Sequence, residues 1–165
     1  MQLSAAQRGY LWVGQVMVPA LINLVLNGLI GWAMFRGVSE LPRLGNPSIV
    51  GDTLGTCFFL PAITCLIVTP IVRAHVKKGT AQPLVGALPG WLAWFQRRLV
   101  LRAIALGLAT VAVAGSVVAA ALALLGIEAL AFTPFLIFKA VFAGLLGGLV
   151  TPLIALLALA DRPVA

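Results

Sequence analysis

Long stretches without a charged residue constrain this chain more than any other feature. Residues 10–35, 53–72 and 103–127 contain no Asp, Glu, Lys or Arg, and residues 129–160 contain only Lys139. About 20 helical residues are enough to cross the hydrocarbon core of a bilayer. The sequence therefore predicts an all-α integral membrane four-helix bundle, as one transmembrane domain over residues 1–165. The expected spans are about 10–35, 48–72, 103–127 and 134–160, with a basic loop at 73–102.

The pattern of these stretches argues against a β-barrel, and their length argues against a cleavable signal peptide. The strands of an outer-membrane barrel alternate apolar and polar residues over about ten positions, whereas these stretches are continuously apolar. The core of a signal peptide is usually about 7 to 15 residues long, which is much shorter than residues 10–35. With 62% hydrophobic and only 9% charged residues, the chain also lies outside the composition of soluble domains.

The positive charges predict the orientation of the chain. Six of the eleven Lys and Arg residues lie in or beside residues 73–102, between the second and third spans. Cytoplasmic loops carry such an excess, so we expect this loop and both termini on the cytoplasmic side of a bacterial inner (plasma) membrane. The net charge of +7 then reflects topology, and no nucleic-acid partner is expected. Arg97, Arg98 and Arg102 are candidates for contacts with anionic lipid headgroups; a plain topology signal is the alternative.

Capping residues and a repeated motif suggest how the spans are arranged. Asn46 and Thr133, each followed by proline, predict the starts of the second and fourth helices, because an N-cap oxygen and an early proline favour helix initiation. The short connection between the third and fourth spans predicts antiparallel neighbours, and hence two transmembrane hairpins side by side. Val-Thr-Pro occurs at 68–70 and again at 150–152. This motif suggests an internal repeat, with two tolerated kinks as the alternative.

Small residues recur along the third span and part of the fourth. In a bilayer, small residues spaced by four let helix backbones approach closely. We therefore expect the third and fourth spans to pack tightly, with contact between copies of the chain as the alternative use of the stripe. The residues are Ala105, Ala109, Ala112, Ser116, Ala119, Ala120 and Ala123 in the third span, and Ala140, Gly144 and Gly148 in the fourth.

Polar residues recur on one face of the first span and one face of the second. The first-span series, at steps of four, is Gln15, Pro19, Asn23, Asn27 and Gly31. The face of the second span comprises Thr53, Thr56, Cys57, Leu60 and Thr64. We expect these two faces to look at each other. Because an amide inside a membrane needs hydrogen-bond partners, we expect both asparagines to bond to a neighbouring helix.

Lys139 and Asp52 give the sharpest functional signal. Each lies five residues after a helix-starting proline, which places both about 7 to 8 Å below the starts of their helices. An ionisable residue inside a membrane span is by default a functional-site hypothesis. The alternative is that Lys139 snorkels to the outer boundary and that Asp52 belongs to a loop. The predicted binding cluster, in the outer half of the bundle, comprises Asn23, Asn27, Asp52, Thr56 and Lys139.

Residues typical of catalytic, metal or redox sites are sparse. The single histidine, His75, lies in the basic loop, and no paired carboxylates or metal-type spacings occur. Cys57 and Cys65 are eight residues apart on one predicted helix, which is too far for a disulfide between them. We therefore expect no metal and no cofactor, and a hydrolytic or redox enzyme is disfavoured.

Two functional interpretations remain open. The polar cluster favours a small transporter or channel-like protein, which would be oligomeric because four helices enclose little volume. The sequence equally fits a structural or accessory subunit of a larger membrane protein complex, in which Lys139 would pair with an acid of the partner. A membrane-embedded enzyme acting on a lipid or quinone has the least support.

Overall fold

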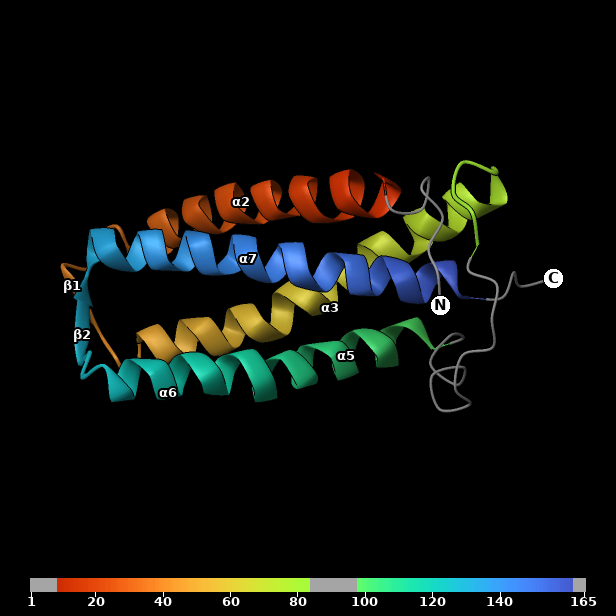
Figure 1. Ribbon diagram of the computed structural model, residues 1–165. Helices are drawn as coiled ribbons and strands as arrows, with labels where there is room; N and C mark the ends of the chain where they lie inside the picture. Colours follow the sequence, from red (N-terminus) through yellow and green to blue (C-terminus); the bar gives the residue numbers. More distant parts are fainter. Residues whose placement is uncertain (1–8, 84–97, 162–165) are drawn as a thin grey trace.

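The computed structural model describes residues 9–83 and 98–161 of the chain. Four helical segments within these residues are long and apolar enough to cross a membrane, and each overlaps one predicted span. They lie side by side in an elongated bundle (Figure 1). The prediction of a helical multi-pass membrane protein is thus confirmed. In chain order, the elements are the π-helix η1 (Tyr10–Met17), α2 (Val18–Phe35), β1 (Glu40–Pro42), α3 (Ile49–Lys77), α5 (Leu99–Thr110), the π-helix η2 (Val111–Gly115), α6 (Ser116–Leu124), β2 (Ala129–Ala131) and α7 (Phe132–Leu159).

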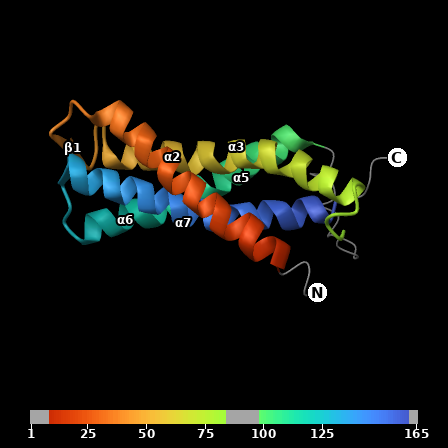
Figure 2. The same ribbon diagram turned by 90° about the horizontal axis from the view of Figure 1, so that it is seen from above.

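The fourth span, α7, is the central helix of the bundle. It packs against α2 on one side and α3 on the other, and α3 packs in turn against α5 and η2 of the third span. Figure 1 shows this order from α2 to α5 and α6, and Figure 2 shows that α2 crosses the bundle obliquely. The two spans of the first hairpin, α2 and α3, therefore do not pack on each other. The expected packing of each hairpin on itself is not what the structure shows, because α2 packs on α7 and the third span packs on α3.

Glycines mark the closest approaches between helices. A Cβ at Gly144 would lie 3.2 Å from the Ala20 carbonyl oxygen on α2, and a Cβ at Gly107 would lie 2.8 Å from the Phe58 carbonyl oxygen on α3. The tight contacts are therefore α2 with α7 and the third span with α3. The expected tight pairing of the third and fourth spans is wrong, because the glycines of the third span face α3. Much of the predicted stripe on the third span is exposed, namely Ala109, Ala112, Ser116, Ala120 and Ala123.

Both observed helix starts differ from the predicted ones by two residues, α3 starting later and α7 starting earlier. Helix α3 begins at Ile49 with Ser48 as its N-cap, whose hydroxyl accepts a hydrogen bond of 3.1 Å from the Gly51 amide. The predicted cap, Asn46, lies in the preceding turn. Helix α7 begins at Phe132 and has no side-chain cap, so Thr133 lies inside it. Proline is tolerated in the first turn of a helix, so Pro134 can be the third residue of α7, whereas Pro47 precedes the N-cap of α3.

A short two-stranded sheet closes one end of the bundle, so the fold is not purely α-helical. Strands β1 and β2 pair antiparallel with Leu41 opposite Leu130. The two connecting segments meet at the same end, and their extended backbones satisfy each other's hydrogen-bonding groups. Leu41 points inward and packs in one core with Ile49 and Phe135, all fully buried. We call this end of the bundle the strand end.

The two halves of the chain have the same order of elements, a helical span, a strand and a second span. Helices α3 and α7, which complete the halves, both start at the strand end and run side by side (Figure 1). Thr69 and Thr151, the central residues of the two Val-Thr-Pro motifs, are both fully buried. A duplicated two-span unit would have this arrangement, and the internal repeat stays a prediction.

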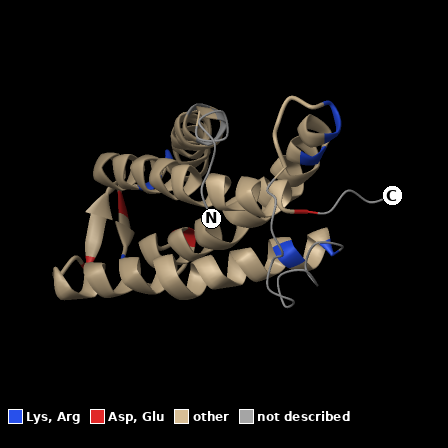
Figure 3. Cartoon of the chain, turned by 45° about the vertical axis from the view of Figure 1, so that its right-hand side comes forward, with Lys and Arg blue, Asp and Glu red and all other residues tan. Residues whose placement is uncertain are grey.

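The charged residues lie mainly at the two ends of the bundle. At the strand end, Arg43 pairs with Glu128 at 3.2 Å. At the opposite end, which we call the terminal end because η1 begins and α7 finishes there, basic residues gather on the last turns of α3 and the first turn of α5 (Figure 3). The apolar middle of the bundle is thus bounded by polar ends, as a membrane-spanning chain requires.

Candidate functional site: a polar groove between α2 and α3

An ion pair between Lys139 and Asp52 forms the centre of the candidate site. The Lys139 ammonium nitrogen lies 2.6 Å from each carboxylate oxygen of Asp52 and donates to both. The Lys139 side chain is only 4% exposed and that of Asp52 11% exposed. Asp52 lies in the first turn of α3 and Lys139 in the second turn of α7. The alternative of a snorkelling Lys139 and a loop Asp52 is therefore wrong, because Lys139 points inward to an acid and Asp52 is helical.

A glycine on α2 provides the room for the lysine. A Cβ at Gly31 would lie 2.7 Å from Cδ of Lys139 and 3.0 Å from a methyl carbon of Leu136. Any larger residue would displace the lysine stem from its place beneath α2. Gly31 belongs to the polar series at steps of four on the first span, but its contribution is one of shape. It lets α2 lie close to the lysine stem, which extends from α7 to Asp52 on α3.

Thr56 lies one helical turn below Asp52 on the same face of α3. Its hydroxyl is 3.5 Å from the Lys139 nitrogen, at the limit of a hydrogen bond. Thr53 does not join this site, because its buried hydroxyl donates to the Ile49 carbonyl at 2.8 Å. The neighbouring threonines of α3 thus have different roles, and only Thr56 faces the ion pair.

The two asparagines of α2 each donate one hydrogen bond to a carbonyl of their own helix. The Asn23 side chain donates to the Pro19 carbonyl at 2.8 Å, and the Asn27 side chain donates to the Asn23 carbonyl at 3.0 Å. The predicted bonds to a neighbouring helix are therefore wrong. A short amide side chain can donate to the carbonyl four residues back in its own helix, so this donor does not require a partner helix. Asn23 still packs closely on α7, where a Cβ at Gly147 would lie 2.5 Å from its nitrogen.

All five predicted site residues line one groove of about 430 Å³. The groove lies between α2 and α3, and Lys139 on α7 contributes to its floor. The polar faces of the first and second spans do share this space, although the two helices do not pack on each other. We call it the polar groove; it is lined by Asn23, Leu26, Asn27, Ile30, Met34, Asp52, Gly55, Thr56, Phe59, Leu60, Ile63, Thr64 and Lys139.

The rim of the polar groove is apolar and exposed. Ile30 and Met34 on α2 are 41% and 65% exposed, and Phe59 and Ile63 on α3 are 60% and 52% exposed. Side chains of this kind belong against lipid tails or against another protein in the membrane. The groove therefore opens sideways from the bundle, with its polar groups set behind an apolar edge.

A second groove of about 590 Å³ lies between α2 and α7 and has a different character. It is lined almost entirely by apolar side chains, including Trp12, Leu21 and Leu145, and by Gly144 and Gly148. No charged residue of the described chain lines it. A lipid acyl chain would fill such a space without specific chemistry, so it is not the candidate site.

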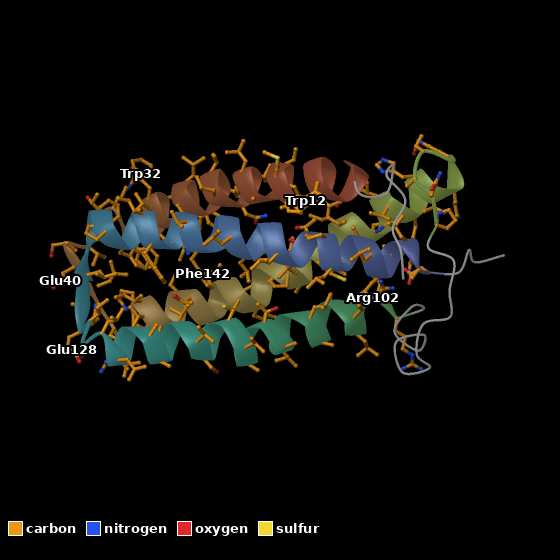
Figure 4. All side chains as sticks on the ribbon, viewed as in Figure 1. Trp12, Trp32, Glu40, Arg102, Glu128 and Phe142 are labelled. Atoms are coloured by element: carbon orange, nitrogen blue, oxygen red, sulfur yellow. The ribbon has the colours of Figure 1, made fainter. Side chains whose placement is uncertain are left out.

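The sequence did not predict a charged cluster at the terminal end. Asp161, just after α7, accepts hydrogen bonds from Arg73 on α3 at 2.6 Å and from Arg102 on α5 at 2.9 Å. The side chains of Asp161 and Arg102 are 4% and 5% exposed. Figure 4 shows Arg102 at the terminal end, far from Glu40 and Glu128 at the strand end. An acid directly after an apolar span, in a chain with only four acids, was the signal that could have revealed the cluster.

This cluster changes the expectation about lipid headgroups. Arg102 is buried and held by Asp161, so its charge is not presented to a bilayer surface. Arg98 is exposed, and Arg97 lies outside the described residues. Contact with anionic headgroups stays a prediction for those two residues.

The polar groove can bind and orient polar groups, but the residues that line it include no nucleophile paired with a base. Among the described residues, no group of three or more His, Cys, Asp and Glu side chains is placed to hold a metal ion. Cys57 and Cys65 are buried thiols in the core. No known protein family, curated protein or solved structure matches this chain. The function must therefore be argued from the groove itself.

Proposed function

We propose that the protein is a small oligomeric transporter or channel-like protein of the bacterial inner membrane, and that the polar groove binds the solute. The observation that carries this proposal is the placement of an ion pair and several amide and hydroxyl groups in a groove that opens toward the membrane interior. Such groups are expensive in hydrocarbon and mark pathways for polar substances in membrane proteins.

The polar lining extends far along the membrane normal. On α3, Asp52, Thr56 and Thr64 lie on one side of the helix, and the distance from the first to the last is about 18 Å at 1.5 Å per residue. The hydrocarbon core is about 30 Å thick. Polar groups therefore accompany a solute from the strand end past the middle of the bilayer, which a purely structural ion pair would not require.

Assembly completes the groove in this proposal. Because the groove is open at the side, a single chain would leave Asn23 and Asn27 near lipid tails. A second copy placed against α2 and α3 would close the opening and exclude lipid. The apolar rim fits such a contact, since its side chains would be buried between the copies.

The orientation follows from the basic residues at the terminal end. With the positive-inside rule, that end and both termini face the cytoplasm, and the strand end faces outward. The ion pair then lies near the outer entrance of the groove, where a solute arriving from outside would meet it first.

A structural or accessory subunit is the second candidate. The exposed stripe of small residues on the third span fits the backbone of a partner helix. Lys139 no longer supports this candidate, because its acid is Asp52 of the same chain. The mass of the protein purified in mild detergent separates the two candidates. A discrete homo-oligomer supports the transporter, whereas a stoichiometric complex with a different protein supports the subunit.

Flux into liposomes that contain the purified protein tests the proposal. We would measure entry of potassium, chloride, protons and a panel of small uncharged and zwitterionic solutes. Asn27→Leu and Lys139→Met should both abolish the flux, and Asn27→Leu should do so while the protein still inserts and assembles. Val25→Leu and Val141→Met are matched controls on the same helices, at exposed positions outside the polar groove. No flux of any of these solutes through the wild-type protein, or equal flux through Asn27→Leu and its control, would contradict the proposal.

A further inference from the structure

We propose that the ligand of the polar groove is dipolar, carrying a cationic and an anionic group in one molecule, and that it binds by exchanging partners with the Lys139–Asp52 ion pair. This inference rests on the proposed function and specifies its solute. The ammonium group of the ligand would contact Asp52, and its anionic group would contact Lys139. Both protein charges keep a partner throughout.

The charge balance of the site supports this class of ligand. Asp52 holds both carboxylate oxygens against the Lys139 nitrogen, and both side chains are largely buried. A lone anion that bound Lys139 would leave Asp52 without a counter-charge, and a lone cation that bound Asp52 would leave Lys139 without one. An unpaired charge in a poorly hydrated site is strongly unfavourable. A dipolar ligand replaces one ion pair by two, so both protein charges stay paired.

Hydrogen-bonding groups deeper in the groove remain available to such a ligand. The amide groups of Asn23 and Asn27 use their N–H groups as donors within α2. Within the described part of the chain, no hydrogen bond uses their side-chain oxygens or the Thr64 hydroxyl. These groups line the same groove below the ion pair. They would contact the body of a ligand whose charged ends lie at Asp52 and Lys139.

The size of the groove fits a small ligand. Its volume of about 430 Å³ lies near the lower end of ligand sites in proteins. A free zwitterion such as an amino acid shares the required chemistry with the headgroup of a zwitterionic phospholipid, and the sideways opening admits either. Soluble zwitterions and lipid nanodiscs separate these two sources.

The experiment uses ligands that share a carbon skeleton and differ in charge. Thermal unfolding of the full-length protein in detergent would be followed with β-alanine, propionate or propylammonium, and with glycine and γ-aminobutyrate as zwitterions of other lengths. At least one zwitterion should raise the wild-type unfolding midpoint by about 5 °C near saturation. Propionate and propylammonium should each bind at least about tenfold more weakly. To test a lipid headgroup as the ligand, thermal unfolding would also be measured in nanodiscs of phosphatidylethanolamine or of phosphatidylglycerol.

Single substitutions should invert the charge preference. Asp52→Asn leaves Lys139 without its acid, so this variant should bind propionate and lose the zwitterion. Lys139→Met leaves Asp52, so it should bind propylammonium instead. Val141→Met is the matched control and should respond as the wild type does. If a single variant fails to fold, Asp52→Asn combined with Lys139→Met still applies, and it should respond to none of the charged ligands.

The outcomes distinguish this inference from the proposed function. Wild-type protein that binds propionate or propylammonium as well as any zwitterion overturns the inference, while flux through the groove would leave the proposed function standing. The inference is equally overturned if neither the zwitterions nor phosphatidylethanolamine stabilise the wild type. Stabilisation by phosphatidylethanolamine alone, without solute flux, supports a dipolar headgroup as the ligand and contradicts the solute pathway.

Discussion

Replacing Lys139 by methionine should destabilise the bundle strongly, because it leaves the Asp52 carboxylate beside α7 without a counter-charge. Methionine keeps most of the length of the lysine stem beneath Gly31, so the change removes the charge more than the packing. Removing one partner of a buried ion pair typically costs about 3 to 5 kcal/mol. Asp52 retains 11% exposure and Thr56 lies close by, so we expect the lower end, about 3 kcal/mol.

The double variant provides the internal check on this reasoning. Asp52→Asn alone leaves Lys139, which is 4% exposed, without its counter-charge, and it should also lower the free energy of unfolding by about 3 kcal/mol. Combining it with Lys139→Met removes both charges, and replacing a buried pair by neutral groups of similar volume is often close to neutral. We therefore expect the double variant to be more stable than either single variant. The coupling energy from the cycle should reach at least about 3 kcal/mol.

Reversible unfolding in mixed micelles, followed by helical circular dichroism, measures all four proteins. A coupling energy below about 0.5 kcal/mol, which is the scatter expected for independent sites, would refute the ion pair as described. The same result would follow if Lys139 reached the outer boundary and Asp52 were hydrated.

Three further predictions concern packing, the terminal end and orientation. Gly107→Ala should destabilise the protein by about 2 kcal/mol, because the added methyl group would meet the Phe58 backbone. Gly55→Ala is the control and should leave the stability unchanged, because the space around its Cβ is open. The midpoints of thermal unfolding of the two variants test this difference. Asp161→Asn should cost about 3 kcal/mol, since Arg102 stays buried without its carboxylate; equal stability of the variant and the wild type would contradict the cluster. In bacterial cells, a membrane-impermeant maleimide should label Leu44→Cys at the strand end and should not label Thr80→Cys. The native Cys57 and Cys65 are fully buried and should not react. Labelling of Thr80→Cys alone would show the opposite orientation.

The spans and the members of the polar site were predictable from the sequence because they depend on local properties. Continuous apolar stretches define membrane helices almost by length alone. Lys139 and Asp52 each follow a proline near a helix start by five residues, which predicted similar depths for the two charges. In the structure Asp52 lies three residues and Lys139 seven residues after the first residue of its helix, and the two side chains still meet at 2.6 Å.

Helix packing was not predictable in the same way. Small residues indicate that two helices approach closely, but they do not show which helix is the partner. Gly144 and Gly148 face α2, although the alanine-rich third span was the expected partner. The prediction that both asparagines bond to a neighbouring helix failed for a similar reason. A side chain that can bond to its own helix does not show which helix lies next to it. The Asp161 cluster was hidden by the same limitation, since its two arginines lie on other helices, far away in the sequence.

The accessibility of Asn27 to water tests the central claim most directly, because it requires no knowledge of the solute. Asn27→Cys lies in the polar groove, whereas Leu29→Cys lies at an exposed apolar position of α2 outside it. Both would be treated in native membranes with a charged methanethiosulfonate, which reacts with hydrated thiolates. If the groove is a polar pathway, Asn27→Cys reacts rapidly and Leu29→Cys does not. If both cysteines stay unreactive, lipid or protein fills the groove and the proposed pathway is wrong.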